Sequence, residues 1–313
     1  TGVDLVEQMI RVANGEALTL SQKDVTLTGW AIENRLYAED PYRNFLPSIG
    51  RLTRYRPPAE IATDAFVVRN DTGVYEGGEI SMYYDPMIAK LVAHAPTRTA
   101  AIDRLHLALD HYEIDGIVSN RQFLSAVLEN DTFRRGDLTT GFIAAEFDGD
   151  FIAGAPADDT AAGLVALGTA IVALQMEERH AGDPDTGFVV VDQTGTRRMI
   201  ELTHVSNRSA RMTVDGAGYN LAGGLQAPVM LFDGTINEVP VAVQVRQSGH
   251  KVVLTNGAAR LALTVLPARY EPMLDHMPAP AEGAGADEIT APMPGQITRI
   301  LVNVGDGGGE GQA

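Results

Sequence analysis

Residues 29–58 read GWAIENRLYAEDPYRNFLPSIGRLTRYRPP and form the most restrictive pattern in the chain. The run Trp30-Ala31-Ile32 is typical of a strand. Pro41 and Pro47 exclude a continuous helix after it, because proline lacks the amide hydrogen that an inner turn needs. The stretch therefore predicts a strand that leads into an ordered loop.

One arginine in this stretch is the candidate functional residue. Arg35 follows Glu33 and precedes the pair Glu39-Asp40. A planar guanidinium with five donors suits an anion or a polarised carbonyl oxygen. A structural ion-pair network at the end of a strand is the other interpretation, and chemistry alone favours it because such networks are common.

The same stretch resembles the C-terminal part of the biotin carboxylase domain family, in which an ECRxxAEDP…FLPSxGxLxxY pattern is characteristic. Here residues 33–41 read ENRLYAEDP, with Asn34 where cysteine is frequent, and residues 45–50 read FLPSIG. The GWA, YAEDPY and LPSIGRL details are most similar to the α-subunit family of propionyl-CoA carboxylases. The resemblance implies that Arg35 is a catalytic and biotin-binding residue, which hydrogen bonds the ureido oxygen of biotin.

The composition is that of an ordinary globular protein with room for about two domains. The chain has 313 residues, of which 45% are hydrophobic and 21% charged. Its net charge of −17 argues against nucleic acid or an anionic membrane surface as a partner. It has no cysteine, which excludes disulfides and thiol chemistry and makes a reducing compartment the default expectation.

No segment predicts a membrane span. The longest apolar run, residues 161–174, has 14 residues against the roughly 20 that a bilayer needs, so we interpret it as a buried helix. Nothing resembles a signal peptide, but the chain begins at Thr1 inside a helical pattern and we expect it to be a fragment. The compartment is then the bacterial cytoplasm by preference, or the mitochondrial matrix if the source is eukaryotic.

The first 148 residues continue the resemblance. Residues 1–14 predict an amphipathic helix with Thr1 and Asp4 as a capping pair, similar to the helix after the catalytic loop of biotin carboxylases. Helices are also expected over 100–112, after Asn120 and after 139–140, and a strand over 87–93. The family's catalytic loop, ATP-grasp lysines and glycine-rich flap do not occur in this sequence, so we expect the fragment alone to be inactive.

Five other residues of this segment are not assigned to a site. Asp85 is interpreted as a turn anchor, and Lys90 as a lysine that snorkels at a sheet edge. His106 and His111 are five residues apart on one helix and should not share a ligand, so no metal site is assigned. Gly141 lies where the family approaches adenine, but it is not counted as a site residue.

The second domain is expected to be a barrel around a helix. Residues 160–180 predict a long helix that is apolar on most faces and must be surrounded. Short antiparallel strands separated by turns can close around it, because closure removes exposed edges. Eight are expected: 188–192, 199–204, 211–214, 229–232, 235–239, 241–246, 251–255 and 260–265. Turns are expected at residues 194–195, 215–216, 233–234, 248–249 and 256–257.

This order of elements resembles the BT domain of the same α-subunit family, which docks on the carboxyltransferase β subunit. His204 and His250 are isolated, and no catalytic constellation is recognised among the strands. The resemblance implies an interaction module.

The expected organisation is therefore α+β: the C-terminal α/β portion of an ATP-grasp biotin carboxylase domain, followed by an antiparallel β-barrel wrapped around a long helix. The boundaries are 1–148 for the carboxylase part, 149–157 for a linker, 158–266 for the BT domain and 267–290 for a second linker. Residues 291–313, which include APMPG and VGD, resemble the start of a biotin carboxyl carrier domain. The lysine that carries biotin is not in this chain.

The resemblance implies part of a propionyl-CoA carboxylase α subunit, a ligase that uses ATP, Mg²⁺ and bicarbonate to carboxylate biotin on the carrier domain of the same subunit. The β subunit would then transfer the carboxyl group to propionyl-CoA. Two alternatives stay open: the α subunit of another acyl-CoA carboxylase, such as the 3-methylcrotonyl enzyme or a broad acyl-CoA one, and a non-catalytic assembly scaffold. The acyl pocket lies on the other subunit, so this chain does not fix the acyl group.

Overall fold

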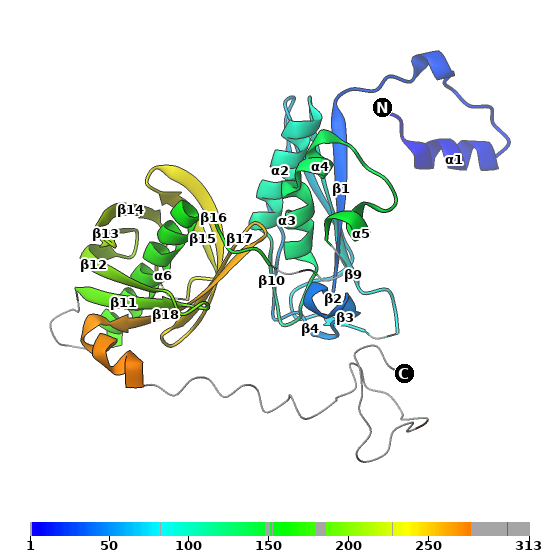
Figure 1. Cartoon of the computed structure of the whole chain (residues 1–313). Coiled ribbons are helices and arrows are strands. Elements are labelled where there is room, and N and C mark those ends of the chain that lie inside the picture. Colours follow the sequence, from blue (N-terminus) through cyan, green and yellow to red (C-terminus); the bar gives the residue numbers. More distant parts are fainter. Residues whose placement is uncertain are drawn as a thin grey trace. The chain divides into compact units, whose positions relative to one another are not determined.

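The structure is a computed structural model that describes residues 2–276, apart from 82, 148–150, 152, 180–185 and 227, together with residue 299 (Figure 1). Thr1–Pro272 form one compact unit and Met273–Ala313 a second. The expected carrier segment, residues 291–313, lies outside the described residues except for 299, as does most of the expected second linker.

The first helix, α1 (Leu5–Ala13), lies within the expected range 1–14 but begins four residues later, at Leu5. Asp4 caps its N-terminus by accepting a 3.0 Å hydrogen bond from the amide of Glu7, and Gly15 follows with a φ of +83°. Thr1, the other expected cap residue, lies outside the described residues. Leu5 and Met9 on its apolar face are 69% and 70% exposed.

An antiparallel sheet organises residues 29–147, which we call the sheet lobe. Its strand order is β1-β9-β7-β6. The bounds are β1 (Trp30–Tyr37), β9 (Met87–Ala95), β7 (Val67–Thr72) and β6 (Ile61–Ala62). Strand β1 extends beyond the expected residues 30–32, because β9 pairs with it from Trp30 opposite Ala95 to Leu36 opposite Ala89. Arg35 therefore lies in the strand and not in the loop after it.

Short elements complete the sheet lobe. They are β2 (Glu39–Asp40), η2 (Pro41–Arg43), β3 (Leu46–Pro47), β4 (Gly50–Arg51), β5 (Arg54–Arg56), β8 (Glu79–Ile80) and β10 (Glu113–Asp115). Outside this lobe, η1 (Gln22–Asp24) precedes the sheet. Pro41 opens the 3₁₀ turn η2, where its missing amide hydrogen costs nothing, and Pro47 lies in β3. The loop is thus ordered by short bridges and a tight turn.

Helix α2 (Arg98–Asp110) covers one face of the sheet, and α3 (Arg121–Glu129) packs beside it (Figure 1). Three apolar residues of α2, Ile102, Leu105 and Leu109, are 0% exposed. Two short helices follow, α4 (Asp131–Arg135) and α5 (Phe142–Glu146), of which the sequence predicted only the second.

The second part is a closed eight-strand barrel around α6 (Asp158–Arg179), as expected. Neighbouring strands are antiparallel throughout. The strands are β11 (Gly187–Asp192), β12 (Arg197–Ser206), β13 (Ser209–Val214), β14 (Ala217–Gly223), β15 (Leu231–Ile236), β16 (Val239–Ser248), β17 (Lys251–Asn256) and β18 (Ala259–Pro267). Apolar side chains of α6 and of the strands form one core, in which Ile171, Phe188 and Phe232 are at most 1% exposed.

Helix α6 is also the one described helix long and apolar enough to cross a membrane, but 78% of its most apolar window is buried inside the barrel. The barrel supplies the apolar surroundings that such a helix needs.

Two of the eight expected strands were assigned wrongly. Asp233-Gly234 was expected to be a turn, but it lies inside β15, and the turn falls at Asn237-Glu238, where both residues have positive φ. Strand β14 was missed. Gly234 is required there because a Cβ would lie 2.3 Å from the main-chain oxygen of Ala222, so this glycine marks a close approach of two strands and not a turn.

The end of the barrel also differs from expectation. A 3₁₀ helix, η3 (Ala268–His276), follows β18 in the segment where the sequence predicted a flexible linker. The extended backbone ends at Pro267, where the barrel closes against β11.

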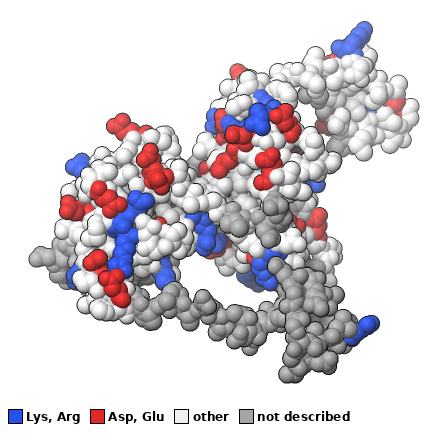
Figure 2. Space-filling model, viewed as in Figure 1, with Lys and Arg blue, Asp and Glu red and all other residues white. Residues whose placement is uncertain are grey.

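The two parts contact each other through polar groups. Gln244 Nε2 on β16 donates to the main-chain oxygens of Asp110 and Tyr112, at 3.1 and 2.8 Å. The amide of Gly257 in the β17–β18 turn donates to the carboxylate of Asp110 at 3.1 Å. On the visible face, acidic and basic side chains are interspersed over both parts (Figure 2).

Candidate functional site

Arg35 lies on the sheet face opposite α2. Side chains alternate along a strand, so Arg35 lies on the same face of β1 as Glu33 and Tyr37. The side chain of Leu36, between Arg35 and Tyr37, points to the other face and is buried in the core at 0% exposed. The Arg35 side chain is 57% exposed, and its Nε donates a 3.0 Å hydrogen bond to Glu33 Oε1. The guanidinium is thus supported on one edge and open to solvent on the other.

The guanidinium of Arg35 stays protonated. The hydrogen bond with Glu33 raises its pKa, and the hydroxyl of Tyr37 adds a smaller contribution in the same direction. Of the three carboxylates that the sequence placed around Arg35, the structure brings only Glu33 to it. Asp40 instead accepts a hydrogen bond from the amide of Tyr42 and begins η2. The expected cluster is therefore a single pair.

Charged residues continue across this face of the sheet. Lys90 on β9 lies opposite Arg35 on one side and opposite Asp71 of β7 on the other. Asp71 forms a 2.9 Å ion pair with Arg69. Lys90 is on a central strand, so the expectation that it snorkels at a sheet edge was wrong. Two cations directly opposite each other repel, and Glu33 beside Arg35 and Asp71 opposite Lys90 reduce that repulsion.

Asn120 positions Arg35 and was not recognised as doing so. The sequence predicted that it caps a helix, and it does stand at the N-cap of α3, but its side chain makes no capping bond. Its Oδ1 accepts from the amide of Tyr37 at 2.9 Å, and its Nδ2 donates to the carbonyl oxygen of Arg35 at 3.1 Å. No sequence signal indicated this, because the contact joins segments far apart in the chain.

Asn34 and Asp85 have structural roles. Asn34 points into the core and is 7% exposed, and its Nδ2 has no hydrogen-bond partner among the described residues. Asp85 Oδ1 accepts from the amide of Met87 at 3.0 Å, which is the turn anchor that the sequence predicted.

The histidines on α2 have different partners. His106 Nε2 lies 2.8 Å from Glu129, whereas His111 Nε2 lies 3.4 Å from Asp233 of the barrel. Over residues 2–276, with the gaps given above, no group of three metal-ligating side chains is close enough to hold a metal ion.

Comparison with known proteins agrees with this architecture. The sequence pattern of the family described as "Biotin carboxylase C-terminal domain" matches residues 33–145, and that of the "Propionyl-coenzyme A carboxylase BT domain" matches residues 169–279. Residues 33–145 thus match the first of these domain families and residues 169–279 the second. The first matched range contains Arg35, and the second covers the C-terminal half of α6 and all eight strands of the barrel. The family resemblance stated from the sequence is confirmed.

Individual relatives match the chain over nearly its whole length. The chain is 43% identical to the propionyl-CoA carboxylase alpha chain of Ruegeria pomeroyi, over 100% of this chain and 49% of the relative. It is 30% identical to the mitochondrial methylcrotonoyl-CoA carboxylase subunit alpha of Dictyostelium discoideum, over 98% of this chain and 46% of the relative. The chain thus spans about half the length of the curated relatives it matches.

Among solved structures, the chain is similar to a biotin carboxylase domain of a thermophilic 2-oxoglutarate carboxylase bound to bicarbonate. The identity is 38% and the TM-score 0.44, over 49% of this chain and 33% of that one.

Proposed function

We propose that the chain is part of the α subunit of a biotin-dependent acyl-CoA carboxylase, most specifically propionyl-CoA carboxylase. The match of residues 169–279 to the propionyl-coenzyme A carboxylase BT domain and the identity of 43% to a propionyl-CoA carboxylase alpha chain support the propionyl enzyme. The complete subunit would use ATP, Mg²⁺ and bicarbonate to carboxylate biotin on its own carrier domain. It would work in the bacterial cytoplasm, or in the mitochondrial matrix of a eukaryote.

Arg35 is the residue of this chain that we assign to the chemistry. Biotin, when bound, supplies the nitrogen that accepts the carboxyl group, and negative charge develops on its ureido oxygen. A guanidinium that is always charged and held at one edge by Glu33 can donate two hydrogen bonds to that oxygen from its open edge. The open, permanently charged edge of Arg35 is the observation that supports this role. We assign no Mg²⁺ ligand to the described residues.

The test is Arg35→Lys in the complete subunit. Lysine keeps the charge but lacks the planar fork, so biotin carboxylation should fall on the order of 10²-fold with stability and ATP affinity unchanged. Arg69→Lys is the matched control: Arg69 lies on the same sheet face, also pairs with a carboxylate two residues away, and is 61% exposed against 57% for Arg35. Its substitution should leave carboxylation within about 2-fold. A stable Arg35→Lys subunit with a normal rate would remove Arg35 from the site.

We further infer that the BT domain binds the carboxyltransferase β subunit. The barrel devotes its interior to packing around α6, and the 3.3 Å contact between His204 and Ser209 lies on its exposed surface, outside that core. Removing residues 158–267 from the complete α subunit should abolish co-purification with the β subunit and leave carboxylation of free biotin. Assembly that survives this deletion would contradict the docking role. If carboxylation is lost as well, thermal unfolding will show whether the sheet lobe has lost its fold.

A further inference from the structure

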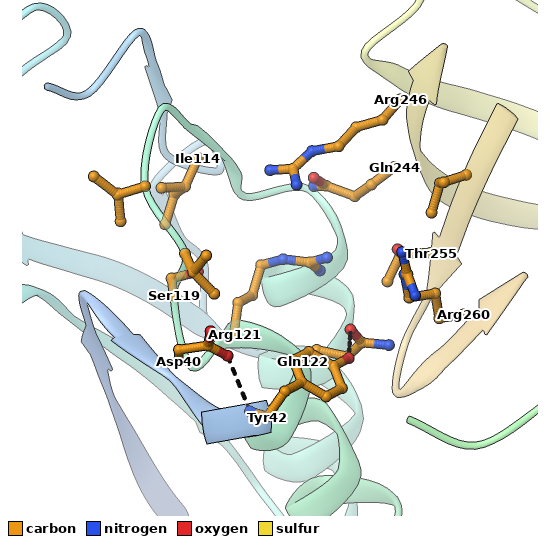
Figure 3. A pocket seen from close by; sticks show the side chains of 13 residues that line it. Asp40, Tyr42, Ile114, Ser119, Arg121, Gln122, Gln244, Arg246, Thr255 and Arg260 are labelled. Atoms are coloured by element: carbon orange, nitrogen blue, oxygen red, sulfur yellow. Dashed lines mark hydrogen bonds between the residues drawn. The ribbon is translucent and has the colours of Figure 1, made fainter. Parts of the chain in front are cut away.

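A cavity of about 340 Å³ lies where the start of α3 meets strands β16 to β18 of the barrel. Both parts of the compact unit contribute to its walls (Figure 3). The residues that matter for its chemistry are Tyr42, Arg121, Gln122, Arg246, Thr255 and Arg260. It is separate from the face of the sheet that carries Arg35.

The walls of this cavity are basic in a strongly acidic chain. Three arginines line it against one carboxylate, that of Asp40, although the chain as a whole has a net charge of −17. The carboxylate of Asp40 accepts a 3.0 Å hydrogen bond from the main-chain amide of Tyr42. In Figure 3, Arg121 and Arg246 extend into the cavity from opposite walls.

Arg121 is buried without full hydrogen bonding. The residue is 9% exposed, and its Nη1 donates a 3.3 Å hydrogen bond to the carbonyl oxygen of Leu109. No other hydrogen bond of its five donors is found in the part of the chain that the structure describes. Burial lowers its pKa, the charge of Asp110 opposes that change, and Arg246 adds to it. A buried cation in this condition is stabilised by an additional anion.

The other two arginines differ in how far they are neutralised. Arg246 forms a 2.7 Å ion pair with Asp115, whereas no hydrogen bond or ion pair of the Arg260 guanidinium is found among the described residues. Arg121 and Gln122 are the first two residues of α3, so amide hydrogens of its first turn, which have no partner within the helix, lie at the same wall. The cavity therefore combines fixed charge, a helix start and hydroxyl groups.

We propose that this cavity binds a phosphate-type oxyanion that joins the sheet lobe to the barrel. Guanidinium groups recognise phosphate through paired hydrogen bonds, and here they come from both parts of the unit. The volume accommodates inorganic phosphate, pyrophosphate or a small phosphate ester. An anion held by Arg121 on one wall and Arg260 on the other would favour the arrangement in which the two walls face each other.

Isothermal titration calorimetry on the 313-residue chain tests the proposal, with sodium phosphate, pyrophosphate and glycerol 3-phosphate titrated at constant ionic strength. We expect saturable binding at one site for at least one of these anions. The anion with the lowest dissociation constant shows whether the cavity prefers an inorganic phosphate or a phosphate ester. Arg260→Ser should weaken that binding on the order of 10-fold, because it removes a charged donor from the wall. Arg260 is exposed, so its substitution should not disturb folding, which circular dichroism will check.

Arg211→Ser is the matched control, because Arg211 is an exposed barrel arginine outside the cavity that bonds Asn220 at 3.2 Å. It should leave the dissociation constant unchanged. Equal weakening by both substitutions would show a diffuse charge effect and would overturn the proposal. The absence of saturable binding up to about 10 mM for all three anions would overturn it as well.

Discussion

Asn120 Nδ2 donates a hydrogen bond of 3.1 Å to the main-chain oxygen of Arg35, across 85 residues of sequence. The main-chain amide of Asn120 also donates to the oxygen of Tyr37, at 3.1 Å. Asn120 thus fixes the end of β1 to the start of α3 and determines where the Arg35 side chain leaves the sheet. The next residue, Arg121, lines the basic cavity, so the two proposed sites share one support.

Asn120→Ala in the complete subunit should lower both stability and carboxylation. The substitution removes the acceptor of the Tyr37 amide and the donor to the Arg35 oxygen, at a cost of about 1–3 kcal/mol in the free energy of unfolding. Because Arg35 loses its main-chain support, we also expect kcat for biotin carboxylation to fall about 10-fold. Urea unfolding and steady-state kinetics measure the two effects.

Asn130→Ala is the control for that prediction. Asn130 also stands at a helix N-cap and makes two side-chain hydrogen bonds, to the amide of Phe133 and to Glu146. Its loss should lower stability by about 1 kcal/mol and leave kcat unchanged. If the two variants have the same kcat, Asn120 has no role in positioning Arg35.

Much of the sheet lobe could be predicted because its signals are local. Proline and glycine positions, the alternation along the strands and the apolar face of α2 each follow from neighbouring residues. The partners of Arg35 could not be predicted in this way. Glu39 and Asp40 are close to Arg35 in sequence but do not pair with it, whereas Asn120, 85 residues away in sequence, bonds its main-chain oxygen. The role of Arg35 in biotin carboxylation stays a prediction.

In the barrel, the sequence predicted the number of strands but not all of their positions. Strand β14, AGYNLAG, has few of the β-branched residues that indicate a strand, and its place is determined by pairing with β13 and β15. Gly234 could be mistaken for a turn residue because the sequence does not show that another backbone lies against it. The basic cavity was missed for the same reason, since its arginines come from α3, β16 and β18.

Asn34→Cys should stabilise the protein. Asn34 is 7% exposed and its Nδ2 has no hydrogen-bond partner among the described residues, a condition that costs about 1–3 kcal/mol for a buried polar group. Cysteine is of similar size and carries no strong donor, so we expect the free energy of unfolding to rise by about 1–2 kcal/mol in urea. Asn34→Asp, which would bury a carboxylate instead, should lower it. A Cys variant less stable than the wild type would show that the Asn34 amide has a partner in solution.

Stability should fall as the pH rises above about 6.5 because of His106. Burial opposes its protonation, but the hydrogen bond to Glu129 and the charge of Asp110 outweigh burial, and the net effect is a raised pKa, with Arg134 opposing it weakly. Because the folded-state pKa lies above the unfolded value of about 6.5, the stabilisation is fully present below about pH 6.5 and is lost as the pH passes the folded-state pKa.

Asp110 acts in the same direction. Burial raises its pKa despite the opposing charges of His106 and Arg121, so its contribution is fully present below the unfolded-state value of about 4 and is lost as the pH rises through the folded-state pKa. The melting temperature should therefore decline as the pH rises, and His106→Gln should flatten the part of the decline above about pH 6.5. An unchanged slope in His106→Gln would contradict the assignment.

Gly234→Ala should destabilise the barrel even though Gly234 has an ordinary strand conformation. A Cβ at Gly234 would lie 2.3 Å from the main-chain oxygen of Ala222 and 2.8 Å from the ring of Phe232, which is 0% exposed. Neither the backbone of β14 nor a buried ring can move freely, so we expect a loss of at least about 2–3 kcal/mol in the free energy of unfolding.

Gly218→Ala on β14 is the matched control, because nothing lies within 4 Å of the added carbon and its φ is not positive. That variant should be neutral or slightly more stable, since alanine restricts the unfolded chain. Chemical unfolding followed by circular dichroism compares the two variants. Equal stabilities would show that β14 and β15 do not approach as closely as Gly223 opposite Gly234 requires.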